Sequence, residues 1–143
     1  MKEPLSERPL LAEELLRGRP GPHYLTGDVL VDANLLGLRA RALFPSTDST
    51  IGDRGHVNVA HYLFGVWNAA HILAVLNGFR TTLSKSGVWS AHRVARPDTP
   101  MDLRVEITDA DIREKVAGGI INAAYSIGDI KYGEFSSNFF ARR

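Results

Sequence analysis

Three residues at the predicted start of a long apolar segment are suited to stabilising developing negative charge: Gly55, His56 and Asn58. The first N–H groups of a helix have no intrahelical acceptor, and the helix dipole is positive at that end. Gly55 would let a ligand carbonyl approach the backbone, and the Val57 N–H would help to bind its oxygen. His56 would lie close enough to transfer a proton. This arrangement would stabilise an oxyanion, although a Gly-His pair at a helix start is also common in an exposed cap.

Polar residues recur along one face of the same segment, at spacings of 3, 4 and 3 residues. These spacings place side chains on one helix face, and the residues are Asn58, His61, Gly65 and Asn68, with His71 one turn further on. Polar side chains on an apolar helix need hydrogen-bond partners. The pattern is typical either of an interface or solvent-facing strip, or of a wet channel that holds a substrate.

The composition excludes several kinds of site. The chain has 143 residues, 17 Lys and Arg against 16 Asp and Glu, and no cysteine. Disulfides, thiolate metal ligands and a cysteine nucleophile are therefore excluded. His61 and His71 are about three helical turns apart, and no Asp or Glu lies between Arg54 and Arg80, so we expect no metal and no cofactor. The near-zero net charge, without a long basic run, argues against a nucleic-acid partner.

Two segments bear on localisation. The N-terminal residues are rich in glutamate, which does not fit a signal peptide. Residues 57–76 are apolar and about long enough to cross a bilayer, but they include two asparagines and two histidines. We therefore expect a buried helix in a cytoplasmic protein that does not contact a membrane.

The pattern of apolar and turn-forming residues divides the chain into a leader, residues 1–22, and one domain, residues 23–143. Four of the seven prolines lie in the leader, which could hold a short helix at residues 9–17. In the domain, the pattern predicts two antiparallel strands within residues 23–44, a loop at 45–54, one helix at 56–77, and strands at 87–96, 103–107, 116–127 and 131–141.

The single long helix determines the predicted architecture. It is apolar nearly all round, so it must be covered on most sides. The predicted fold class is therefore α+β, with an antiparallel sheet wrapped around one long central helix. One helix and one sheet leave surface uncovered, so we expect a homodimer or a higher homo-oligomer.

The start of this helix resembles that of hotdog-fold acyl thioesterases, which reads roughly G-H-V-N-x-x-x-Y-L. The matching residues here are Gly55 to Asn58, followed by Tyr62-Leu63. The order of the predicted elements is also that of the hotdog fold. Within this fold the chain is most similar to the FcoT-like group, through Asn68, a later Trp89-Ser90 pair and the Gly133-Glu134 pair. The similarity covers residues 23–141 and leaves the leader outside.

The resemblance implies a homodimeric enzyme that hydrolyses an acyl thioester of coenzyme A or of acyl carrier protein. The acyl group would lie along the dimer interface, with its carbonyl at the helix N-terminus. Some members of the group also add glycine, as a co-substrate, to the β-carbon of an α,β-unsaturated acyl thioester. They then hydrolyse the product to an N-carboxymethyl-3-amino acid.

The roles that fit this chemistry fall on a few positions. We assign His56 as the principal acid/base, Glu134 as the carboxylate base, and Asn58 as a residue that positions substrate or water. The substrate-binding positions implied are Gly55, Val57, His61, Asn68, Trp89 and Ser90, and His61 could equally be structural. The carboxylate of glycine would need a partner, for which Arg54, Arg93 and Arg96 are available.

The chain departs from the family pattern at one position. Many hotdog thioesterases carry an aspartate three residues before the glycine of the helix motif, and that position is Gly52 here. Asp53 is adjacent but out of register, so a base on the histidine or on Glu134 is favoured. Glu134 also shares a predicted strand face with Tyr132, Ser136 and Asn138, and a solvated face would explain that pattern equally well.

Three other functions remain open from the sequence. A simple thioesterase would hydrolyse the thioester without adding glycine. A hotdog hydratase or dehydratase would pair a histidine with a carboxylate on the central helix, but this helix has no Asp or Glu. A non-catalytic acyl-binding hotdog protein would keep the channel and lack the chemistry.

Overall fold

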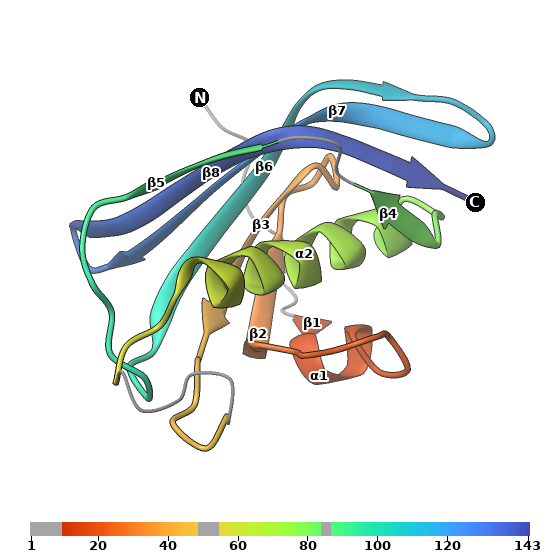
Figure 1. Ribbon diagram of the computed structural model, residues 1–143. Coiled ribbons are helices and arrows are strands. Elements are labelled where there is room, and N and C mark those ends of the chain that lie inside the picture. The colour runs from red at the N-terminus through yellow and green to blue at the C-terminus, as the bar shows by residue number, and fades with distance from the viewer. Residues whose placement is uncertain (1–9, 49–54, 84–86) are drawn as a thin grey trace.

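The computed structural model describes residues 10–48, 55–83 and 87–143 (Figure 1). In these residues one long helix lies against a curved sheet. The elements are β1 (Leu10–Leu11), α1 (Ala12–Leu15), β2 (Leu25–Val31), β3 (Gly37–Ala42), α2 (Val59–Leu76), β4 (Thr81–Leu83), β5 (Gly87–Ala91), β6 (Met101–Ile112), β7 (Val116–Ile127) and β8 (Ile130–Arg142).

The strands form one sheet whose described neighbours are all antiparallel. Its order is β1-β2-β3-β6-β7-β8-β4, and β5 also pairs with β8. The predicted fold class is confirmed: this is the α+β hotdog fold, an antiparallel sheet wrapped around one long helix. The sequence did not predict β1 and β4, because two or three residues are too few to show an alternating pattern.

Helix α2 begins later than predicted and ends at Leu76, one residue before the predicted end. It starts at Val59 rather than at His56, because Asn58 has an extended backbone (φ −104°, ψ 173°) and caps the helix. At the other end Gly78 adopts a φ of +84°, the left-handed conformation that ends many helices.

The core lies between α2 and the sheet, and Tyr125 of β7 is central to it. Its ring is completely buried, and its hydroxyl donates a 2.6 Å hydrogen bond to the Tyr62 carbonyl of α2. A Cβ on Gly65 would collide with the Tyr125 hydroxyl. Gly65 is therefore a packing glycine that lets α2 lie close to β7.

Asn68 connects α2 to the segment before β2. Its side chain is buried, its Oδ1 accepts a 2.8 Å hydrogen bond from the Tyr24 N–H, and its Nδ2 donates to the Pro22 carbonyl at 3.2 Å. The polar face predicted on α2 is thus an internal connection at this position. It is neither a solvent-facing strip nor a channel there.

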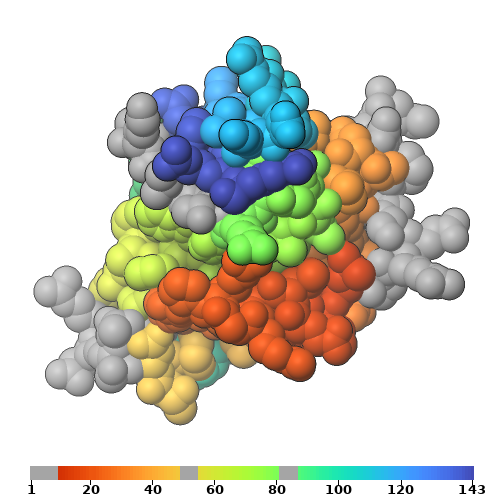
Figure 2. All heavy atoms as spheres, turned by 90° about the vertical axis from the view of Figure 1, so that its right-hand side faces the viewer, coloured from red at the N-terminus to blue at the C-terminus, as the bar shows by residue number. Residues whose placement is uncertain are grey.

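The described part of the leader packs onto the domain. Strand β1 pairs with β2, and Ala12 and Leu16 are buried in the core. Figure 2 shows this segment, in red, lying against the C-terminal part of α2, in green. The leader therefore extends the sheet by one short strand and covers one end of the helix.

One side of α2 remains uncovered within a single chain. Val59, Phe64 and Trp67 are 44%, 41% and 40% exposed. Helix α2 is long and apolar enough to cross a membrane by length and composition, but about 56% of it is buried inside the protein. It is therefore the core helix of this fold, with one apolar side left open.

Candidate active site

Asn58 and His61 form a reciprocal cap at the start of α2. The Asn58 side-chain oxygen accepts a hydrogen bond from the His61 N–H, and His61 Nδ1 accepts one from the Asn58 N–H, both at 3.2 Å. This is the capping box, with histidine in the place usually taken by Glu or Gln. Both side chains therefore hold the helix start in place, whatever further role they have.

The predicted use of the Val57 N–H is corrected by the structure. That group donates a 2.9 Å hydrogen bond to the Ala95 carbonyl, so it does not face a ligand. The Asn58 N–H is taken by His61. Within the described residues, the N–H groups of Val59 and Ala60 have no hydrogen-bond acceptor. These two groups, rather than that of Val57, are the donors offered by the helix end.

Gly55 and His56 lie immediately before this cap. Gly55 has a φ of +66°, in the region that favours glycine, and a Cβ there would meet no atom within 4 Å. His56 is half-buried. The predicted group of Gly55, His56 and Asn58 is therefore present at the helix start. Gly52, Asp53 and Arg54 lie outside the described residues.

His61 is a buried and neutral histidine. Its side chain is only 3% exposed, and burial lowers the pKa of its imidazole, while the Asp48 carboxylate partly opposes that shift. Because Nδ1 accepts a hydrogen bond, the neutral ring carries its proton on Nε2. The rings of Tyr24 and Phe44 meet the imidazole edge-on, with centroids at 5.9 and 6.4 Å.

Asp48 provides a carboxylate near His61 in the first turn of α2, and it was not predicted from the sequence. It accepts a 2.5 Å hydrogen bond from the Tyr24 hydroxyl, and its charge acts on His61. It lies in the polar loop that follows β3, well before the helix motif. Only the contacts with Tyr24 and His61 identify it, because both partners are distant in sequence.

Glu134 and Ser90 lie on the other side of the sheet from α2. They are paired in the ladder between β5 and β8, as are their neighbours Trp89 and Phe135. Trp89 stacks on Tyr62 of α2. Because side chains alternate across a strand, Glu134 and Ser90 point away from α2. Within one chain, this arrangement does not fit the prediction that Glu134 acts as a base with His56. It also does not fit the prediction that Ser90 contacts a substrate at the helix end.

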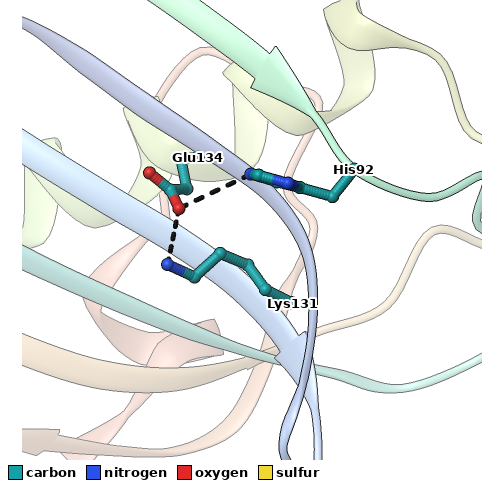
Figure 3. A network of polar contacts seen from close by, with 3 residues as sticks. All are labelled: His92, Lys131 and Glu134. Atoms are coloured by element: carbon teal, nitrogen blue, oxygen red, sulfur yellow. Dashed lines mark hydrogen bonds and ion pairs between the residues drawn. The ribbon is translucent and has the colours of Figure 1, made fainter.

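Glu134 has its own partners on this outer face. It accepts a short hydrogen bond from the Lys131 ammonium and lies 3.5 Å from His92 Nε2 (Figure 3). The hydrogen bond and charge of Lys131, followed by His92, lower the pKa of the Glu134 carboxyl. The side chain is 45% exposed. This is a solvated ion-pair network, the alternative that the sequence left open for Glu134.

Trp89 lies on the inner face, as a substrate contact would need. Its ring stacks on Tyr62 with centroids 4.8 Å apart and planes 26° apart. A Cβ on Gly133 would collide with the Trp89 ring, so the glycine of the Gly-Glu pair makes room for the stack. In the described residues, the buried Tyr62 hydroxyl and Trp89 Nε1 have no hydrogen-bond partner.

Among the described residues, the helix end therefore offers two N–H donors, two histidines and one carboxylate. These belong to Val59, Ala60, His56, His61 and Asp48. Over the described ranges, no group of three His, Asp or Glu side chains is arranged to hold a metal ion. The chemistry available from these groups is hydrogen bonding to an oxyanion and transfer of a proton.

Comparisons with known proteins support the fold and go no further. No family model matches the chain, and no curated protein matches its sequence significantly. The fold is similar to that of a Campylobacter jejuni sigma28-regulated virulence protein, Cj0977 (TM-score 0.61, 15% identity, 91% of this chain and 86% of that one). It is also similar to a hypothetical thioesterase from Streptococcus pneumoniae, solved with coenzyme A (TM-score 0.59, 6% identity, 76% and 81%). A third similar structure is a probable thioesterase from Bartonella henselae (TM-score 0.56, 18% identity, 76% and 97%).

Proposed function

We propose that this protein is an acyl thioesterase that hydrolyses a thioester of coenzyme A or of acyl carrier protein at the N-terminus of α2. The observation that carries the proposal is the pair of N–H groups at Val59 and Ala60, which lack an acceptor among the described residues. They follow His56 by three and four residues, and the Asp48 carboxylate acts on His61 in the same turn. Solved structures with this fold include a hypothetical thioesterase with coenzyme A, which supports the substrate class.

In the proposed reaction the carbonyl oxygen of the thioester accepts hydrogen bonds from the Val59 and Ala60 N–H groups. Water attacks the carbonyl carbon and gives a proton to a base. The protonated base returns that proton to the sulfur as the carbon–sulfur bond breaks, which releases a carboxylic acid and a thiol. The N–H donors stabilise the negative charge that develops on the oxygen. His56 is the first proposed base, and the half-buried Asp48, whose carboxylate is held by the Tyr24 hydroxyl, is the second.

A thiol-release assay tests this function with little background. The chain has no cysteine, so a thiol-reactive dye reports only the coenzyme A that is set free. Purified protein is incubated with acyl-CoA thioesters of several chain lengths, and release is compared for the wild type, Asp48→Asn and His56→Ala. His92→Ala is the matched control, because His92 is an exposed histidine on the outer face. No release from any thioester, with binding intact, would indicate an acyl-binding protein without chemistry.

We further propose, on the resemblance to FcoT-like proteins, that the same site adds glycine to an α,β-unsaturated acyl thioester before hydrolysis. The amine of glycine would lose a proton to the base as its nitrogen bonds to the β-carbon, and the α-carbon would gain a proton. Arg96 is the proposed partner of the glycine carboxylate. It is adjacent to Ala95, whose carbonyl accepts the Val57 N–H at the helix start.

Mass spectrometry distinguishes the possible products of an enoyl thioester. The free enoic acid alone would indicate a simple thioesterase, and an N-carboxymethyl-3-amino acid, formed only with glycine, would indicate both steps. A 3-hydroxyacyl product would indicate a hydratase and contradict the proposal. Arg96→Gln should raise the glycine concentration needed for addition without affecting simple hydrolysis, and Arg104→Gln, on the outer face, is its control.

We also propose that the protein is a homodimer. The open side of α2 exposes Val59, Phe64 and Trp67, and among the described strands β5 pairs only with β8. A second copy would cover these apolar side chains and the free strand edge. Light scattering should give twice the chain mass for the wild type and the chain mass for Trp67→Glu. Ile112→Glu, an exposed apolar position at the far end of β6, should remain dimeric.

A further inference from the structure

Among the described residues, two buried side-chain polar groups lack hydrogen-bond partners, and both belong to the stacked pair of Tyr62 and Trp89. The Tyr62 hydroxyl and the Trp89 indole nitrogen are buried without any partner in the described part of the chain. The Tyr62 side chain as a whole is about 4% exposed. Buried polar groups are nearly always hydrogen-bonded, so two adjacent exceptions indicate that a partner is missing.

The neighbouring buried polar side chains show that the core otherwise satisfies such groups. The Tyr125 hydroxyl donates to the Tyr62 carbonyl, and Tyr125 lies 4.8 Å from Tyr62 between ring centroids. Both polar atoms of Asn68 are hydrogen-bonded to backbone. In the part of the chain that the structure describes, the unsatisfied groups are therefore confined to one place, between α2 and β5.

The chemistry of the two groups defines the missing partner. An indole N–H can only donate a hydrogen bond, so the group that meets Trp89 must be an acceptor. Burial, with the nearby Tyr132, raises the pKa of Tyr62 to about 12, so its hydroxyl keeps its proton and can donate at any ordinary pH. In the described residues, the ring contacts of this pair are all with aromatic side chains, and none is with a cation. A neutral oxygen fits these donors better than a carboxylate, whose charge would be buried without a counter-ion.

We propose that Tyr62 and Trp89 form a specificity site that binds a neutral oxygen on the acyl chain, a hydroxyl or keto oxygen close to the thioester. This inference rests on the proposed thioesterase function. Tyr62 lies in the first turn of α2, directly after the N–H donors of Val59 and Ala60. An acyl group whose thioester oxygen meets those donors would bring its first carbons to the Tyr62–Trp89 pair. A chain oxygenated near the thioester would then satisfy both buried donors, and a plain alkyl chain would leave them unsatisfied.

The test compares two acyl-CoA substrates of equal length, butyryl-CoA and 3-hydroxybutyryl-CoA. The wild type should prefer the oxygenated substrate in kcat/KM, and Tyr62→Phe and Trp89→Phe should each reduce that preference about tenfold, the usual effect of one hydrogen bond to a neutral group. Both substitutions keep an aromatic ring in the stack, so the fold should survive. Tyr132→Phe is the matched control, because it removes a hydroxyl next to the pair, and it should keep the wild-type preference.

A binding measurement separates this inference from the proposed function. In Trp67→Phe, Trp89 is the sole tryptophan, since the chain has two. If an oxygen of the acyl chain accepts a hydrogen bond from the Trp89 N–H, the fluorescence of Trp89 should shift with 3-hydroxybutyryl-CoA and not with butyryl-CoA. The same fluorescence shift without hydrolysis of either substrate would support the specificity site and contradict the proposed thioesterase activity. Hydrolysis of both substrates with equal kcat/KM in the wild type and in both variants would overturn the specificity site alone, and would indicate that only water meets the two donors.

Discussion

Replacing Asn68 with alanine distinguishes a structural residue from a substrate contact. The Asn68 side chain accepts from the Tyr24 N–H at 2.8 Å and donates to the Pro22 carbonyl at 3.2 Å. Tyr24 is about 2% exposed, so its N–H would lose the hydrogen bond to Asn68 in a place that water does not reach easily. An unsatisfied buried donor costs about 1–3 kcal/mol. The Pro22 carbonyl belongs to an exposed residue and can be hydrated instead, so it adds little.

The expected loss is therefore about 1–3 kcal/mol in the free energy of unfolding. For a domain of this size each kcal/mol lowers the melting temperature by roughly 3–4 °C, so Asn68→Ala should melt about 3–12 °C below the wild type. Urea unfolding followed by circular dichroism gives the free energy directly. The substrate KM of the folded variant should change little, because Asn68 is buried and both of its polar atoms are already hydrogen-bonded to backbone.

Asn122→Ala is the matched control for this experiment. Asn122 is also an asparagine with two side-chain hydrogen bonds, to Thr108 and Ser136, but it lies on the exposed outer face of the sheet. Water can replace those bonds, so its loss should be below about 0.5 kcal/mol. The reasoning is refuted if Asn68→Ala is as stable as Asn122→Ala. A stable Asn68→Ala protein with a raised KM would restore the substrate contact suggested by the sequence.

Three further predictions concern the site and its surroundings. His56→Ala should lower kcat about 100-fold or more, the usual effect of removing a general acid or base. The control His92→Ala should not lower kcat. Equal kinetics for the two variants would remove His56 from the mechanism. Glu134→Gln should keep kcat within about twofold, because Glu134 faces away from α2 and pairs with Lys131 in solvent; a loss of turnover without unfolding would place the outer face in the reaction. Burial lowers the pKa of folded His61 below its usual 6.5, so the unfolded chain takes up more protons below that pH. His61 therefore favours folding fully above pH 6.5 and less as the pH falls through the lowered pKa. His61→Gln keeps a capping-box residue at this position without titrating, and its urea midpoint should depend less on pH between 7 and 5; an unchanged dependence would contradict the buried neutral histidine.

The fold could be predicted because its strongest signals are local. One segment with helical periodicity, residues 59–76, stands among segments that alternate, and those patterns depend only on neighbouring residues. The exact start of α2 was missed by three residues. The cap depends on the backbone conformation of Asn58 and on His61 folding back to it, and the sequence motif does not specify either.

The candidate site contains some of the residues assigned from the sequence. The residues that were misplaced share a common cause. Alternation correctly groups Glu134 with Ser136 on one face of β8, but it does not say which face meets the helix. The ladder between β7 and β8 also shifts between Tyr125 and Ser126, so that Tyr132 is an extra residue and does not follow the alternation. Tyr132 packs against the core instead of sharing the outer face with Glu134. Such shifts depend on pairing with another strand.

Tyr24 shows why the candidate carboxylate could only be found in the structure. Its backbone N–H is held by Asn68 in the middle of α2, and its hydroxyl holds Asp48, which acts on His61 in the first turn. Tyr24 thus contacts two residues, Asn68 and Asp48, that are far from it in the sequence. None of the contacts Tyr24–Asn68, Tyr24–Asp48 and Asp48–His61 follows a local sequence pattern. Because the backbone of Tyr24 makes the buried connection and its side chain orders the site, loosening Tyr24 at Asn68 should also loosen Asp48. Tyr24→Phe keeps the Asn68 bond and removes only the hydroxyl. If Asp48 is the base, this variant should keep most of its stability and lose turnover, whereas the reverse result would show that the Asp48 contact serves only the fold.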